Sequence, residues 1–96
     1  MSEIPLAKLH RLLVDVNSGR LGVRVFCEAF EMAYNHELDR SVLSAREALV
    51  FAELFAQVAW YSPFPEERAL IPHYRSEADI LNAAASAATR LSQPIA

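Results

Sequence analysis

Four segments of this chain place apolar side chains every three or four residues, and this periodicity constrains the fold more than any other feature. The first segment begins at Ser2, a possible N-cap, with Pro5 in the first helical turn, and stops at Asn17–Gly19. The second runs from about residue 21 to residue 34. We expect both segments to be amphipathic helices.

The other two expected helices open on capping sequences. Ser44 and Glu47 form an S-x-x-E capping box before the third, and Ser76 with Asp79 supplies a similar signal before the fourth. The third has the widest apolar surface, so we expect it to be the most buried. The side chains expected to face the core share helical spacing; they are Leu6, Leu9, Leu12, Leu13, Val16, Val23, Phe26, Cys27, Phe30, Ala33, Tyr34, Ala48, Val50, Phe51, Ala52, Leu54, Phe55, Val58, Ala59, Tyr61, Ile80, Leu81, Ala84, Ala87, Ala88 and Leu91.

Composition supports helices rather than a sheet. The chain has only two glycines, and apolar residues make up 53% of it, whereas a strand-rich sandwich needs frequent turn residues. We therefore predict an all-α protein, one domain over residues 1–96, folded as an antiparallel four-helix bundle with a long loop between the third and fourth helices. Cys27 lies among the apolar positions, so we expect a buried, inert thiol.

The long connection, YSPFPEERALIPHY (Tyr61–Tyr74), is unusual in a chain this short. Pro63, Pro65 and Pro72 restrict its backbone and so reduce the entropy lost when it docks on a partner. We interpret the segment as a partner-binding platform. The alternative is a structural strap that only joins two helices.

Charge is distributed unevenly along the chain. Residues 25–79 hold ten acidic against four basic side chains, whereas residues 1–24 hold two acidic and four basic ones. An acidic centre disfavours direct nucleic-acid binding and favours a basic protein partner. The alternative is a solvated surface that only keeps the protein soluble.

Catalytic and metal-binding signatures are missing from the sequence. His10, His36 and His73 are scattered, and no H-E-x-x-H, C-x-x-C, G-x-S-x-G or phosphate-binding glycine loop occurs. We predict a protein that is not an enzyme and has no cofactor and no metal. The longest apolar run is well short of the roughly 20 residues of a membrane span, and no secretion signal is evident, so we predict a cytoplasmic protein with no membrane partner.

Three stretches of the sequence are similar to a known family. They are FCEAFEMAYN (26–35), LSAREALVFAELFAQVAWYSP (43–63) and PEERALIPHYRSEADIL (65–81). Within them lie the aromatic spacing Phe26–Phe30–Tyr34, the core Glu47–Phe51–Leu54–Phe55, the Tyr–Ser–Pro opening of the loop, Arg68, Tyr74 and the Ser–Glu start of the last helix. These patterns resemble the colicin D-type immunity proteins, which include immunity proteins of contact-dependent growth inhibition systems. The resemblance covers roughly Leu9 to Leu91.

The resemblance implies a small helical bundle that neutralises the nuclease domain of a cognate toxin, commonly one that cleaves transfer RNA. In the colicin D case the inhibitor presents acidic side chains to the basic cleft that would hold the RNA, and the interfaces of other members vary with the toxin. For this chain we predict an acidic, aromatic partner-binding set from three segments; it comprises Glu37, Asp39, Tyr61, Phe64, Glu66, Glu67, Tyr74, Glu77 and Asp79.

Other interpretations of the same residues stay open at this point. Tyr61 and Phe64 would instead hold the loop on the bundle, Glu77 and Asp79 would only complement the helix dipole, and Arg68 would pair with a neighbouring acid and order the loop. A different class of function is a regulatory or assembly module that binds a partner helix or forms a homodimer through the apolar surface of the third helix.

Overall fold

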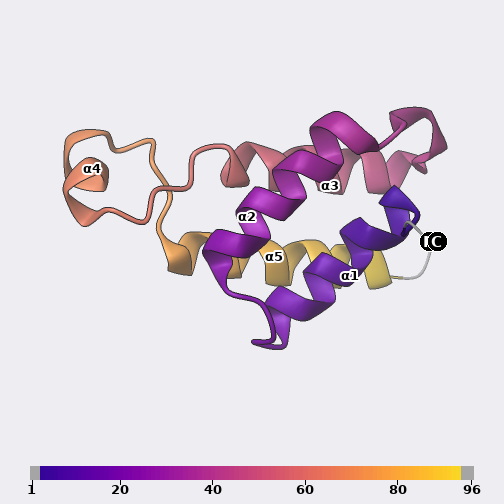
Figure 1. The fold of residues 1–96 in the computed structure, drawn as a ribbon, viewed down its shortest axis with the longest axis horizontal. Coiled ribbons are helices and arrows are strands. Elements are labelled where there is room, and N and C mark those ends of the chain that lie inside the picture. The colour runs from indigo at the N-terminus through magenta and orange to yellow at the C-terminus, as the bar shows by residue number, and fades with distance from the viewer. Residues whose placement is uncertain (1–2, 94–96) are drawn as a thin grey trace.

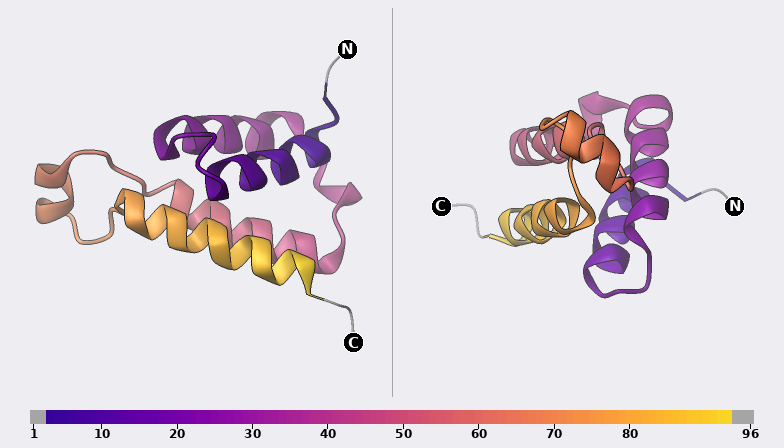
Figure 2. Two further views of the ribbon diagram at one scale, coloured as in Figure 1. Left: turned by 90° about the horizontal axis from the view of Figure 1, so that it is seen from below. Right: turned by 90° about the vertical axis from the view of Figure 1, so that its left-hand side faces the viewer.

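The computed structural model describes residues 3–93, and helices account for nearly all of its regular structure. The four longer helices are α1 (Pro5–Asn17), α2 (Val23–Met32), α3 (Ala45–Val58) and α5 (Glu77–Ser92). They form two layers, with α1 and α2 in one and the antiparallel pair α3 and α5 in the other (Figure 1, Figure 2). The predicted all-α bundle is confirmed.

The helix ends follow the local sequence closely. Pro5 occupies the first turn of α1, with Ile4 at the N-cap and no side-chain cap; Ser2 lies outside the described residues. After α1 the chain reverses at Gly19, whose φ of 80° lies in the left-handed region where glycine is favoured. The capping boxes predicted at Ser44 and Ser76 are both present.

The second predicted helix is longer and less regular than its periodicity indicates. After Met32, α2 continues as a π-helix, η1 (Ala33–Glu37), and a 3-10 turn, η2 (Arg40–Val42), follows before α3. The ring of Tyr34 stacks on the rings of Phe30 and Phe55, and the Arg40 guanidinium lies 4.4 Å from the Tyr34 ring centre. Aromatic packing therefore holds this irregular end of α2 against α3.

The core is one cluster at the centre of the four longer helices. Phe26, Phe30 and Phe51 are fully buried, together with Leu9 of α1 and Ile80 of α5. Ala84 and Ala87 bring α5 close to its neighbours because their side chains are small. Cys27 is buried as predicted. The core faces of α1 and α2 agree with the expected stripes, whereas Leu81 of α5 is exposed.

The third predicted helix forms, but its buried side is narrower than expected. Its buried side chains are Val50, Phe51, Leu54 and Val58, whereas Phe55 is only partly buried. The alanines at 48, 52 and 59, which were expected in the core, are exposed. The expectation that α3 is the most buried helix is also wrong, because it buries four of 14 residues and α2 buries four of ten. Among residues 3–93, no further helix covers its outer side (Figure 2).

The long connection after α3 contains a helix that the sequence did not indicate. This is α4 (Pro65–Leu70), six residues long, and it lies beyond the end of the bundle (Figure 1, Figure 2). Within residues 3–93, no helix has both the length and the hydropathy needed to cross a bilayer.

Candidate functional site

The part of the molecule that stands apart from the bundle is residues 60–75, here called the arm. It projects from the end where α3 finishes and α5 begins, and α4 forms its tip (Figure 2). The two chain segments at its base are joined by backbone hydrogen bonds. The Ser62 amide donates to the Arg75 carbonyl at 3.0 Å, and the Arg75 amide donates to the Trp60 carbonyl at 2.7 Å. The arm is thus closed at its base.

Ser62 organises the interior of the arm. It is 4% exposed and is the one polar residue classed as buried in the described part of the chain. Its hydroxyl donates to Oε1 of Glu67 at 2.9 Å and accepts from the Phe64 amide at 3.2 Å. Its carbonyl accepts a hydrogen bond from Nη1 of Arg68 at 2.7 Å. Both ends of α4 are therefore tied to one residue.

The local sequence explains the short helix at the tip. Pro65 occupies the first turn, where its fixed φ suits a helix and no amide donor is required. Glu66 and Glu67 lie in the first turn and Arg68 in the last, which complements the helix dipole. Ile71 precedes Pro72 and is extended, with φ −124° and ψ 98°, so the helix ends there.

The arm exposes large apolar side chains. Leu70 is 83% exposed and Phe64 48%, and Ile71 is exposed beside them. Trp60 is also exposed, although its ring packs against the rings of His73 and Tyr74 at centroid distances of 4.9 and 5.8 Å. Apolar side chains gathered on one projecting segment mark a site of protein interaction more often than isolated ones do.

The structure divides the predicted binding residues into different environments. On the arm, Glu66 faces solvent, whereas Phe64 is 48% exposed and also lines a cavity with residues of α2 and α3. Tyr61 and Tyr74 are partly buried, and burial raises the pKa of the Tyr61 phenol. Glu67 is half-buried against Ser62. Arg68 orders the arm through a backbone carbonyl rather than through an acid.

At the start of α5, the two predicted acids have different roles. Asp79 belongs to the capping box: its carboxylate accepts from the Ser76 amide at 2.9 Å, and this hydrogen bond lowers the Asp79 pKa. Glu77 is exposed and lies near Tyr61 and Arg68, where it lines a shallow cavity at the arm base. Glu77 is thus available to a partner, whereas Asp79 serves the helix.

Glu37 and Asp39 lie at the opposite end of α3 from the arm. The 14 residues of α3 span about 21 Å at 1.5 Å per residue. Glu37 pairs with Lys8 at 3.3 Å, and Asp39 accepts hydrogen bonds from the amide and hydroxyl of Ser41, which lower its pKa. The six predicted acids therefore do not form one continuous face.

Two acids outside the predicted binding set also lie next to the arm. Glu28 and Glu31 of α2 line a cavity together with Tyr61 and Phe64. Their spacing of three residues indicated one helix face, but nothing local indicated that this face meets the arm. Leu70 and Ile71 were likewise missed, because apolar residues in a loop are usually assumed to pack inward.

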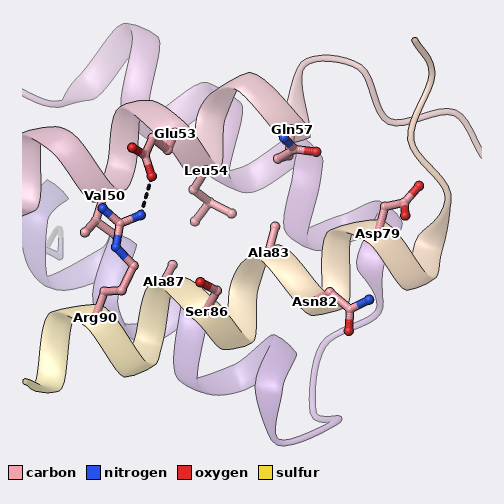
Figure 3. Close-up of a pocket in the computed structure, with 10 residues that line it drawn as sticks. All are labelled: Val50, Glu53, Leu54, Gln57, Asp79, Asn82, Ala83, Ser86, Ala87 and Arg90. Atoms are coloured by element: carbon pink, nitrogen blue, oxygen red, sulfur yellow. Dashed lines mark hydrogen bonds and ion pairs between the residues drawn. The ribbon is translucent and has the colours of Figure 1, made fainter. Parts of the chain in front are cut away.

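A second concave region lies between α3 and α5, with a volume of about 350 Å³ (Figure 3). Leu54 and Ala87 lie along it, and the ion pair of Glu53 with Arg90 crosses one end. Gln57 and Asn82 lie toward the other end. Asp79, which belongs to the capping box of α5, and Ser86 also line the groove, but the Ser86 hydroxyl forms no hydrogen bond with a described residue, so the groove shows no nucleophile paired with a base.

The histidines do not gather at a site. His10 hydrogen-bonds Glu47 at 2.9 Å and packs edge-on against Phe51, and His73 packs against Trp60. Within residues 3–93, no three side chains of the metal-ligating types lie close enough together to hold a metal ion.

Comparison with models of known protein families, with curated proteins and with solved structures found no match for this chain. The resemblance to immunity proteins therefore stays a prediction. The arm and the acids around it are the part of the described structure that favours a function in binding another protein.

Proposed function

We propose that this chain is an immunity-type inhibitor that neutralises the nuclease domain of a cognate bacterial toxin in the cytoplasm. The arm and the acids beside it dock in the basic cleft of a nuclease that cuts transfer RNA. The inhibitor itself performs no chemistry and requires no cofactor.

The observation that carries this proposal is the arm, which exposes apolar side chains and is nevertheless tied down internally. Phe64 and Leu70 face solvent, while Ser62 and Arg68 hold the backbone beneath them. A segment already held in one conformation loses less entropy when it docks. Exposed aromatic and aliphatic anchors on such a segment are the residues expected to contribute most to affinity.

Electrostatics supports a basic partner. Glu66 and Glu77 are exposed, and neither forms an ion pair or hydrogen bond with a described residue. Carboxylates without internal partners are free to face the lysines and arginines with which a nuclease grips phosphates. Charge attraction of this kind chiefly raises the association rate, and dissolved ions screen it.

A second candidate function, an assembly module, is favoured by the outer side of α3. Leu49 is exposed there. The exposed alanines at 48, 52, 56 and 59 have small side chains, so they form an apolar surface that another helix can approach closely. Such a surface suits a partner helix or a second copy of the chain. Light scattering after gel filtration tests this second function. A dimer that the Leu49→Glu substitution dissociates would support an assembly module.

The proposed function is tested in cells. The chain is co-expressed with the nuclease domain of the toxin encoded directly upstream of its gene, and transfer-RNA integrity and growth are measured. We expect protection by the parent chain and reduced protection by Phe64→Ala, with Val42→Ala as the control because Val42 is an exposed apolar residue far from the arm. Intact killing in the presence of the parent chain, or the absence of an upstream toxin, would contradict the proposal.

A further inference from the structure

A small cavity at the base of the arm carries an inference beyond the docking of the arm itself. It lies between α2, the end of α3 and the first residues of the arm, and its volume is about 250 Å³. This is below the range of about 300–1,000 Å³ that is usual for small-molecule and cofactor sites. The space therefore suits one side chain better than a free ligand.

The charge of the cavity is negative. Glu28 and Glu31 line it, and Arg24 is the only basic residue among the lining side chains. Arg24 reaches only Glu28, at 3.8 Å, and both side chains are largely exposed, so this pair is weak. Glu31 forms no ion pair or hydrogen bond with any residue of the described chain. The negative charge of the Glu31 carboxylate is thus not balanced by a paired basic side chain among the described residues.

A neighbouring thiol responds to the same field. The pKa of Cys27, which also lines the cavity, is raised to about 12, first by burial and then by the negative charges of Glu31 and Glu28. Both carboxylates line the same cavity as the thiol. A positive charge placed there would be stabilised by both.

The walls of the cavity are apolar and aromatic. Val58, which is buried, lines it, and so do Tyr61 and Phe64 of the arm. A long cationic side chain matches such walls, because its methylene stem packs on apolar surface while its charged head stays near water and carboxylates. Aromatic faces add attraction for a cation.

We propose that this cavity is the binding pocket for a single arginine side chain of the partner protein. A guanidinium presents a planar fork of donors to two carboxylates and stacks on aromatic rings, which a lysine ammonium does not do equally well. This proposal rests on the proposed function in that it takes the partner surface to be basic. It adds the residues that select one side chain on that surface.

The test requires no partner protein. The ¹⁵N-labelled chain is titrated with N-acetyl-arginine amide at constant ionic strength, and amide shifts are followed by NMR. N-acetyl-citrulline amide, which has a similar shape and no charge, is the matched control. We expect saturable shifts at the amides of Cys27, Glu31 and Tyr61, and none of comparable size with citrulline.

Two variants separate the pocket from the general acidity of the chain. Glu31→Gln is expected to weaken the arginine response about three- to fivefold, the effect of one exposed ion pair. Glu53→Gln removes an exposed carboxylate that lines the α3–α5 groove and not this cavity, and we expect it to leave the response unchanged.

The arginine pocket would be contradicted by any of three results. These are equal shifts with N-acetyl-citrulline amide, shifts spread over all acidic residues, and an unchanged response in Glu31→Gln. These outcomes are independent of the cell test. Arginine binding without protection against the toxin would contradict the immunity function and support the pocket. Protection without arginine binding would support the immunity function and contradict the pocket.

Discussion

Nη1 of Arg68 donates a hydrogen bond of 2.7 Å to the carbonyl oxygen of Ser62 and thereby ties the last turn of α4 to the base of the arm. The Ser62 hydroxyl holds the other end of α4 through Glu67 and the Phe64 amide. A single buried serine thus keeps the exposed apolar side chains of the arm in one arrangement.

Replacing Ser62 by alanine is expected to loosen the arm without unfolding the bundle. The change leaves the Phe64 amide and the Glu67 carboxylate without their partner, at a cost of about 1–3 kcal/mol for closing the arm. Hydrogen exchange should accelerate within residues 62–75 and stay unchanged in α1 and α2. Ser86→Ala is the control, because Ser86 lies in the α3–α5 groove and its hydroxyl forms no hydrogen bond with any residue that the structure describes. Unchanged protection of the arm would contradict its role.

The two phenylalanines of α3 should respond differently to truncation. Phe51 is fully buried, so Phe51→Ala is expected to lower the free energy of unfolding by about 3–5 kcal/mol. Phe55 is partly buried and retains solvent contact, so Phe55→Ala should cost clearly less. Urea unfolding of both variants measures the difference. Equal losses would contradict the difference in burial between Phe51 and Phe55.

Stability should decline in acid partly through Glu47. Hydrogen bonds from the Ser44 amide and then from His10 lower the pKa of Glu47 below its ordinary value of 4.5. A depressed folded-state pKa contributes stability above pH 4.5, which is lost as the pH falls from there through the folded pKa. Glu47→Gln keeps a capping-box residue but does not titrate, so its melting temperature should fall less between pH 5 and pH 3, as scanning calorimetry would show. The same slope in both proteins would exclude this contribution.

The two glutamates of α4 should separate binding from folding. Glu66 is exposed without a partner, so Glu66→Lys should leave melting almost unchanged and slow association with the nuclease, most strongly at low salt. Glu67→Lys should also increase hydrogen exchange in the arm, because it removes the acceptor of the Ser62 hydroxyl. Surface plasmon resonance at two ionic strengths measures the first effect. An unaffected association rate for Glu66→Lys would place the electrostatic contact elsewhere.

Cys27 should be unreactive while the chain is folded. Its side chain is buried and its pKa is raised to about 12, so almost no thiolate forms at pH 8. Ellman's reagent should therefore react slowly with the native protein and within seconds after denaturation. Rapid reaction of the native protein would mean that the space between α2 and the arm opens readily.

Features that depend on neighbouring residues could be predicted from the sequence. Both capping boxes and the stop at Gly19 involve residues within three positions of each other, so short-range hydrogen bonding and backbone sterics determine them. The core faces of α1 and α2 follow in the same way, because large apolar residues repeat at helical spacing along one side of each helix, although Val14, Val25 and Met32 are exposed elsewhere on them.

The core face of the third helix could not be predicted from local sequence alone. Apolar residues surround most of α3, so periodicity alone did not determine which side faces the core. Packing chose the side with Val50 and Leu54, whose bulk fills the space against α2 and α5, and left the alanines outside. The volume of neighbouring helices is a long-range property that no local pattern contains.

The sequence by itself determined that this chain is a helical bundle with an acidic centre and a proline-rich connection. Only the tertiary structure decided that the connection is a closed arm with its own helix, that Glu37 and Asp39 lie far from it, and that Glu28 and Glu31 lie beside Phe64. The physical reason is distance along the chain. Helix formation and capping act over a few residues, whereas the meeting of α2 with the arm joins side chains more than 30 positions apart through packing of the whole core.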